Sequence, residues 1–145
     1  RDLISKRSVR ITRDLAEQLI SADPTGLEST ASGLVSDTFR EMRTNLLHPV
    51  VIVDYLREAY LHPAEEVRIT FDMQLRSGLN SVDMFNPYLP TVPPFDHDEI
   101  ILEVKYNQVL PPYIANLLTY ALRDGACRSA ISKYVYCRRF EFKDF

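Results

Sequence analysis

The sequence has 145 residues, and 46% of them are hydrophobic, which is enough for one globular domain or part of one with a buried core. Its net charge of −3 argues against a nucleic-acid binder that works through an exposed basic surface. No apolar run reaches the ~18 residues that a membrane span needs, and the spacing of the two cysteines, Cys127 and Cys137, fits no zinc motif.

The first fifty residues predict one strand and two helices. Residues 2–12 predict a strand, because residues 8–12 alternate polar and apolar side chains as expected for a strand with one buried face. Residues 13–21 predict a short helix that begins at Thr12 or Asp14, and residues 22–36 a loop. Residues 37–47 have apolar side chains at helical spacing and predict a second helix, with a cap at residue 36 or 37.

The remaining residues predict three strands and two helices. Residues 50–57 and 67–74 are expected to form an antiparallel hairpin, and residues 99–107 a central strand. Residues 77–98 contain four prolines and predict an irregular segment. Helices are predicted over residues 111–122 and 132–138. Because no βαβ rhythm is present, the order predicts an α+β fold with an antiparallel sheet and helices on its apolar face.

The predicted strands each present one apolar and one charged face. The charged side chains on the second face are Arg10, Arg57, Arg68, Glu103 and Lys105. A solvated face is the simpler interpretation of this alternation. However, four cations with one anion would repel each other across strands that lie ~4.8 Å apart. A curved or closed sheet would enclose these cations, and a chain of phosphates would neutralise them.

Five runs of this sequence, in the same order, resemble the polyphosphate polymerase (VTC) domain of the triphosphate tunnel metalloenzymes, the superfamily that includes the CYTH-like proteins. Each run alone is weak, but the set is specific. The runs are Ser5-Lys6-Arg7-Ser8-Val9-Arg10-Ile11-Thr12, Val51-Ile52-Val53-Asp54-Tyr55-Leu56-Arg57, Val67-Arg68-Ile69-Thr70-Phe71-Asp72, Ile101-Leu102-Glu103-Val104-Lys105-Tyr106 and Ser132-Lys133-Tyr134.

The resemblance implies a sheet that forms part of an antiparallel triphosphate-tunnel barrel with helices packed on its outer face. It implies a transferase that moves the terminal phosphoryl group of ATP to polyphosphate with a divalent metal, Mn²⁺ or Mg²⁺. The implied partners are ATP and triphosphate or polyphosphate, and no nucleic acid.

The resemblance also implies roles for individual residues. Glu103 would be the metal ligand. Arg57, Arg68, Lys105 and Lys133 would be the catalytic residues. The phosphate-binding residues would be Arg10, Tyr55, Arg57, Arg68, Lys105, Ser132 and Lys133.

The acidic strand with which the family opens has no counterpart here. We therefore expect residues 1–145 to be the C-terminal portion of a single VTC-type domain, inactive alone, whose sheet is completed by the missing N-terminal half or by another copy. We expect a cytoplasmic location, with any membrane association made through other parts or subunits of the parent protein. The alternatives are a triphosphatase of the same superfamily, a non-catalytic module that binds polyphosphate or inositol phosphate, and an α+β scaffold whose charged face is wet.

Overall fold

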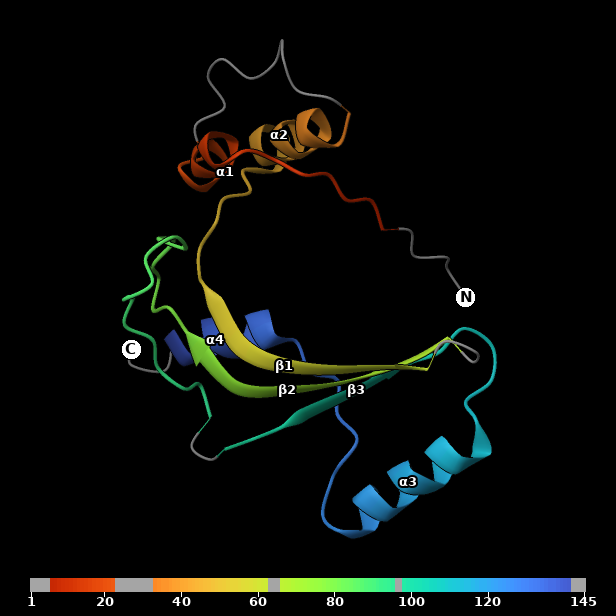
Figure 1. Ribbon diagram of the computed structural model, residues 1–145. Coiled ribbons are helices and arrows are strands. Elements are labelled where there is room, and N and C mark those ends of the chain that lie inside the picture. Colours follow the sequence, from red (N-terminus) through yellow and green to blue (C-terminus); the bar gives the residue numbers. More distant parts are fainter. Residues whose placement is uncertain (1–5, 23–32, 63–65, 96–97, 142–145) are drawn as a thin grey trace. The chain divides into compact units, whose positions relative to one another are not determined.

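The computed structural model describes residues 6–22, 33–62, 66–95 and 98–141, in two compact units, residues 1–50 and 51–145 (Figure 1). The first unit contains helices α1 (Arg13–Ile20) and α2 (Gly33–Asn45). The second contains three strands and two helices: β1 (Val53–His62), β2 (Val67–Ser77), β3 (Ile101–Lys105), α3 (Pro112–Arg123) and α4 (Lys133–Glu141). The predicted α+β class with an antiparallel sheet is therefore confirmed.

The helices of the N-terminal unit begin where their capping signals and apolar patterns allow. The Oγ1 atom of Thr12 accepts a hydrogen bond from the Leu15 amide at 3.3 Å, so the predicted cap of α1 is confirmed. Helix α2 begins at Gly33 and ends at Asn45, so the prediction of a loop through residue 36 and a helix start at 37 was wrong. Burial of Val35 explains the earlier start, because its side chain packs in the same stripe as Phe39.

The predicted N-terminal strand is not present in residues 6–12, which form neither helix nor strand. The remaining part of that prediction, residues 2–5, lies outside the described residues. An alternating pattern only makes a segment suitable for a sheet, and a strand forms when its backbone pairs with a neighbour. No described strand pairs with residues 6–12.

The sheet is antiparallel in the order β1-β2-β3, so β2 is its central strand among the described residues. The predicted hairpin is confirmed, and both of its strands are longer than predicted. The strand predicted over residues 99–107 is shorter, spans only Ile101–Lys105, and lies at an edge of the described sheet (Figure 1). The three strands do not close on themselves, so the described part of the chain forms an open sheet and not a barrel.

The register places the two kinds of side chain on opposite faces, as predicted. Asp72 lies opposite Arg57 on β1, and Glu103 lies opposite Thr70. We call this side the polar face; its residues are Arg57, Arg68, Thr70, Asp72, Glu103 and Lys105. The other side, the apolar face, carries Tyr60, Ile69, Phe71, Leu102 and Val104.

Burial on the polar face is concentrated around Thr70 and Asp72, where α4 lies against the sheet. Thr70 and Asp72 are 2% and 1% exposed, whereas Tyr60 and Leu102 on the apolar face are 57% and 37% exposed. Helix α4 lies against β1 and β2, and its first residue, Lys133, contacts Asp72 (Figure 1). The prediction that the helices pack on the apolar, outer face is therefore wrong for α4. The physical reason is that a buried carboxylate must be paired, and α4 supplies one of the two counter-charges.

Two features position the end of the sheet that carries Asp72. Gln74 and Leu75 together oppose the single residue Tyr55, and Gln74 has a φ of 52°, which marks a bulge in β2. Beyond the bulge, the buried thiol of Cys137 on α4 donates to the carbonyl of Arg76 at 3.7 Å. The bulge and this contact bring α4 over the strand that carries Asp72.

The segment after β2 is irregular, as predicted, and is tied to the sheet by polar contacts. Ser77 and Val92 form an isolated bridge. The Arg76 side chain donates from Nε to the Thr91 hydroxyl at 2.6 Å and from Nη2 to the Thr91 carbonyl. Phe95 packs against Tyr136 of α4 with ring centroids 4.8 Å apart. Residues 78–95 therefore form a fixed loop beside α4 and not a separate element.

Candidate phosphate-binding site

The centre of the polar face is a buried aspartate that holds two cations. The Asp72 carboxylate accepts from Arg57 Nε at 2.5 Å and from Arg57 Nη2 at 2.7 Å, so the guanidinium and carboxylate groups are paired in a bidentate fork. Lys133 Nζ lies 2.6 Å from Oδ2 of the same carboxylate. Two cations and one anion leave a net positive charge at this point of the face.

The Tyr55 ring lies beside both cations. Its centroid is 5.1 Å from Arg57 Cζ and 5.2 Å from Lys133 Nζ, within the range of cation–π attraction. We call Tyr55, Arg57, Asp72 and Lys133 the Asp72 cluster. Its members come from β1, β2 and the first residue of α4, so the cluster forms only when the sheet and the helix come together.

Hydrogen bonding shifts the titration of both members of the fork. The hydrogen bonds from Arg57, together with Lys133, lower the pKa of Asp72 to about 2, although burial opposes this shift. The same hydrogen bond raises the pKa of Arg57 above its ordinary value. Asp72 is therefore charged, and Arg57 and its partner remain an ion pair, across the physiological pH range.

A second group of charges lies further along the polar face. Lys105 Nζ is 2.9 Å from Glu103 Oε1 on the same strand, and both side chains are more exposed than those of the Asp72 cluster. Arg68 is directly opposite Lys105 in the register and exposed. Like charges at directly opposite positions repel, so the pair would be stabilised by an anion between its two cations.

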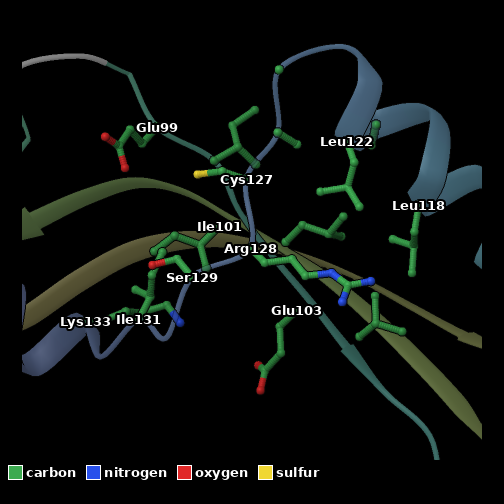
Figure 2. Close-up of a pocket in the computed structure, with 16 residues that line it drawn as sticks. Glu99, Ile101, Glu103, Leu118, Leu122, Cys127, Arg128, Ser129, Ile131 and Lys133 are labelled. Atoms are coloured by element: carbon green, nitrogen blue, oxygen red, sulfur yellow. The ribbon is translucent and has the colours of Figure 1, made fainter.

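A groove connects Glu103 with the start of α4. It has a volume of about 840 Å³ and lies between β3, the C-terminal half of α3 and residues 125–131 (Figure 2). Glu103 and Lys133 both line it, as do apolar side chains such as Leu118 and Leu122. The Arg128 side chain extends into this groove from residues 125–131 (Figure 2). The groove is large enough for several linked phosphates, and both acidic and basic side chains line it.

The model of the VTC domain family matches residues 1–142, almost the whole chain. The chain belongs to the VTC domain family. A search of curated proteins and a search of solved structures each found no match. The suspected resemblance is therefore confirmed at the level of the family.

In this VTC domain the sequence-predicted residues divide between the two units. Arg10 is exposed in the N-terminal unit, and its part in the site stays a prediction. The other seven lie in the second unit, and the structure brings three of them together in the Asp72 cluster. Those seven are Tyr55, Arg57, Arg68, Glu103, Lys105, Ser132 and Lys133.

Ser132 has a structural contact of its own in this VTC domain. Its Oγ accepts from the Val135 amide at 3.4 Å, which caps the N-terminus of α4. The predicted start of the last helix near residue 132 is therefore confirmed. The hydroxyl hydrogen of Ser132 remains available for a ligand, at the positive end of the α4 dipole.

The donor set for a divalent metal is small. Within the described ranges, no group of three or more His, Cys, Asp or Glu side chains could hold a metal ion. Asp72 is bonded to two cations, so Glu103 is the carboxylate of the polar face that best fits a metal. One carboxylate is sufficient for Mg²⁺-type ions that take their other ligands from phosphate oxygens and water.

Asp72 is the site residue that the sequence-based prediction missed. Its alternation with Arg68 and Thr70 puts it on the charged face, but the residues predicted from the sequence do not include it. A signal was present, because an aspartate within a buried strand needs a counter-charge. Arg128 was also missed, and its loop position gives no such signal.

Thr70, on the polar face, is the other buried polar residue near the cluster. Among the described residues, its Oγ1 atom has no hydrogen-bond partner.

The described part of the chain contains no helix with the length and apolar character to cross a lipid bilayer.

Proposed function

We propose that this VTC domain binds a triphosphate or polyphosphate chain on the polar face of its sheet. The observation that carries the proposal is the Asp72 cluster, two cations of which share a single buried carboxylate and so keep a net positive charge. The nearby Arg68 and Lys105 extend this charge along the face, at the spacing of neighbouring strands. A linear polyanion fits such a row better than a single phosphate does.

We further propose that the parent protein transfers the terminal phosphoryl group of ATP to polyphosphate. In that reaction the terminal oxygen of the polyphosphate forms a bond to the γ-phosphorus, the bond between that phosphorus and the β–γ bridging oxygen breaks, and ADP leaves. Catalysis of such a transfer is mainly alignment and charge neutralisation. Arg57 and Lys133 would bind the phosphate oxygens, and Arg68 and Lys105 would hold the adjoining part of the chain. Tyr55 and Ser132 would donate hydrogen bonds.

Mn²⁺ or Mg²⁺ would be bound by Glu103 together with phosphate oxygens. Such an ion neutralises charge that develops on the transferred group. Because Glu103 is paired with Lys105, binding of the ion would release that lysine for a phosphate oxygen.

The first test is binding of tripolyphosphate, measured by calorimetry. We expect the Arg68→Gln variant, which leaves the Asp72 cluster intact, to bind roughly tenfold more weakly, since a charge-assisted hydrogen bond contributes on the order of 1.5 kcal/mol. The double variant Arg57→Gln/Arg68→Gln should bind tripolyphosphate about 100-fold more weakly than the wild type. Arg123→Gln removes the same charge from the last turn of α3, at a position that does not line the groove, and should stay within about twofold.

Wild-type affinity in the double variant would show that the proposed site does not bind tripolyphosphate. Thermal melting of each variant separates loss of binding from loss of the fold. This control matters most for Arg57, whose removal leaves Asp72 with one counter-charge.

The second test separates the activities. The parent protein is incubated with ATP and manganese, and its products are resolved on a gel. Polymer supports the transferase, and free phosphate without polymer supports a triphosphatase. Tight binding of tripolyphosphate with neither product supports a non-catalytic binding module.

A further inference from the structure

We propose that Asp72 is a positioning residue of the phosphate site, which fixes Arg57 and Lys133 in the orientation that receives the phosphate chain and stays bonded to both when that chain binds. The proposal rests on the proposed function of the polar face. It concerns a residue that none of the sequence motifs had marked as functional.

The contacts of Asp72 restrict both cations. The fork from Nε and Nη2 fixes the plane of the Arg57 guanidinium group, and the register already places the two residues opposite each other. Oδ2 is also bonded to Lys133 Nζ, so one oxygen links the sheet to α4. Because the carboxylate is 1% exposed, water cannot easily replace it.

The donors that remain indicate where an anion can bind. A guanidinium group has five N–H donors; Asp72 takes one on Nε and one on Nη2, so three remain on Nη1 and Nη2. An ammonium group has three donors, of which Asp72 takes one, so Lys133 keeps two. The Arg57 and Lys133 side chains are still 32% and 19% exposed, so these remaining donors can be reached.

A positioning role of Asp72 and a purely electrostatic role predict opposite changes in phosphate affinity when its carboxylate is removed. If Asp72 acted only as a competing negative charge, its neutralisation would strengthen binding of a polyanion. If it acts by position, neutralisation leaves two cations close together without a counter-ion, and they move apart. Binding of phosphate must then also order both side chains, which costs free energy, so the affinity falls.

The test compares Asp72→Asn and Asp72→Glu with the wild-type chain by titration with tripolyphosphate. Asp72→Asn keeps the shape and removes the charge, and Asp72→Glu keeps the charge and moves it by one methylene. We expect both variants to bind at least tenfold more weakly. Glu58→Gln is the matched control, since it makes the same charge change beside Arg57 on the opposite face, and should change affinity less than twofold.

Tighter binding by Asp72→Asn, or unchanged binding by Asp72→Glu, would overturn the positioning role and leave the proposed function standing. Absence of binding by the wild-type chain would instead overturn the proposed function. Each variant is first checked by thermal melting, and one that does not fold is replaced by the following measurement, which needs no variant at Asp72.

The second readout is the NMR signal of the Arg57 Nε–H group in the wild-type chain, assigned by its loss in Arg57→Lys. A persistent bond to Asp72 should keep this signal sharp, and it should move little when tripolyphosphate is added, while the Nη signals of Arg57 shift. A large shift or exchange loss of the Nε–H signal on binding would show that phosphate displaces Asp72, and would refute the proposal.

Discussion

Asp37 and Asp72 are both held by two cationic side chains, and they differ in their burial. Asp37 lies between Arg7, at 2.9 Å, and Arg40, and its side chain is 36% exposed. The hydrogen bond from Arg7 lowers the pKa of Asp37, but water screens such an exposed pair. Asp72 is 1% exposed, so its interaction with the cations of its cluster is screened far less.

This difference gives a pH dependence for Asp72. Its pKa falls from the ordinary 3.8 to about 2 on folding, so its stabilisation is fully present above pH 4 and is lost as the pH falls through about 2. The shift corresponds to about 2 kcal/mol. Urea unfolding at pH 6 and pH 2 should show that the wild type loses about this much more stability than Asp72→Asn does.

Other carboxylates titrate equally in the wild type and in Asp72→Asn, so the difference between the two isolates Asp72. Asp37→Asn provides the comparison for an exposed pair. It should lose nearly as much stability between pH 6 and pH 2 as the wild type does. An equal pH dependence of the wild type and Asp72→Asn would contradict the ion-pair assignment.

At the scale of elements, α4 has two separate tasks: it covers the polar face and it delivers Lys133. Both depend on its N-terminus, where Ser132 provides the cap. The contact between Cys137 and the carbonyl of Arg76 holds the helix further along β2. A change that loosens the first turn of α4 therefore acts on stability and on the Asp72 cluster together.

We expect Ser132→Ala to lower the free energy of unfolding by about 1 kcal/mol, because an orphan amide at the helix start loses its acceptor. Tripolyphosphate affinity should also fall, since Lys133 is the next residue. Ser129→Ala in the preceding loop is the control, and urea denaturation is the measurement. If the two alanine variants are equally stable, the cap does not contribute.

At the scale of the whole molecule, the net charge and the local charge have opposite signs. The chain carries −3 overall, while the Asp72 cluster keeps a positive charge on a covered face. Long-range attraction of a large polyanion depends on the overall field, whereas capture of a thin phosphate chain depends on the few cations that it touches. If the proposed function is correct, this arrangement would favour polyphosphate over duplex nucleic acid.

We therefore expect tripolyphosphate to bind to the chain and duplex DNA not to bind at 150 mM salt, in a competition measured by fluorescence anisotropy with a labelled polyphosphate. Tripolyphosphate should displace the label, and an equal phosphate concentration of duplex DNA should not. Displacement by DNA at comparable concentration would indicate a general polyanion surface.

The apolar face raises a separate point about the fold. Tyr60 and Leu102 lie on this face and are substantially exposed, and β1 and β3 are edge strands of the described sheet. Apolar faces and strand edges of this kind usually pair with another element. Completion of the sheet by further strands or by another copy of the chain stays a prediction.

The sequence by itself determined the features that depend on local periodicity. Alternation with a period of two assigned the side chains of β2 and β3 to the correct faces. Helical spacing together with helix-start signals located the four helices of the described residues, with errors mainly at their ends. The five motif runs also identified the VTC family correctly. These signals lie within short stretches of chain, so no knowledge of distant contacts is needed to read them.

Only the tertiary structure decided on which face of the sheet α4 packs and what Asp72 does. Residues 6–12 show that alternation alone does not make a strand, because pairing requires a neighbour. The bond between Asp72 and Lys133 joins β2 to α4, and no local pattern relates those two segments. A buried charge is stable only with its partners in place, so the chain covers its polar face where α4 supplies the second cation.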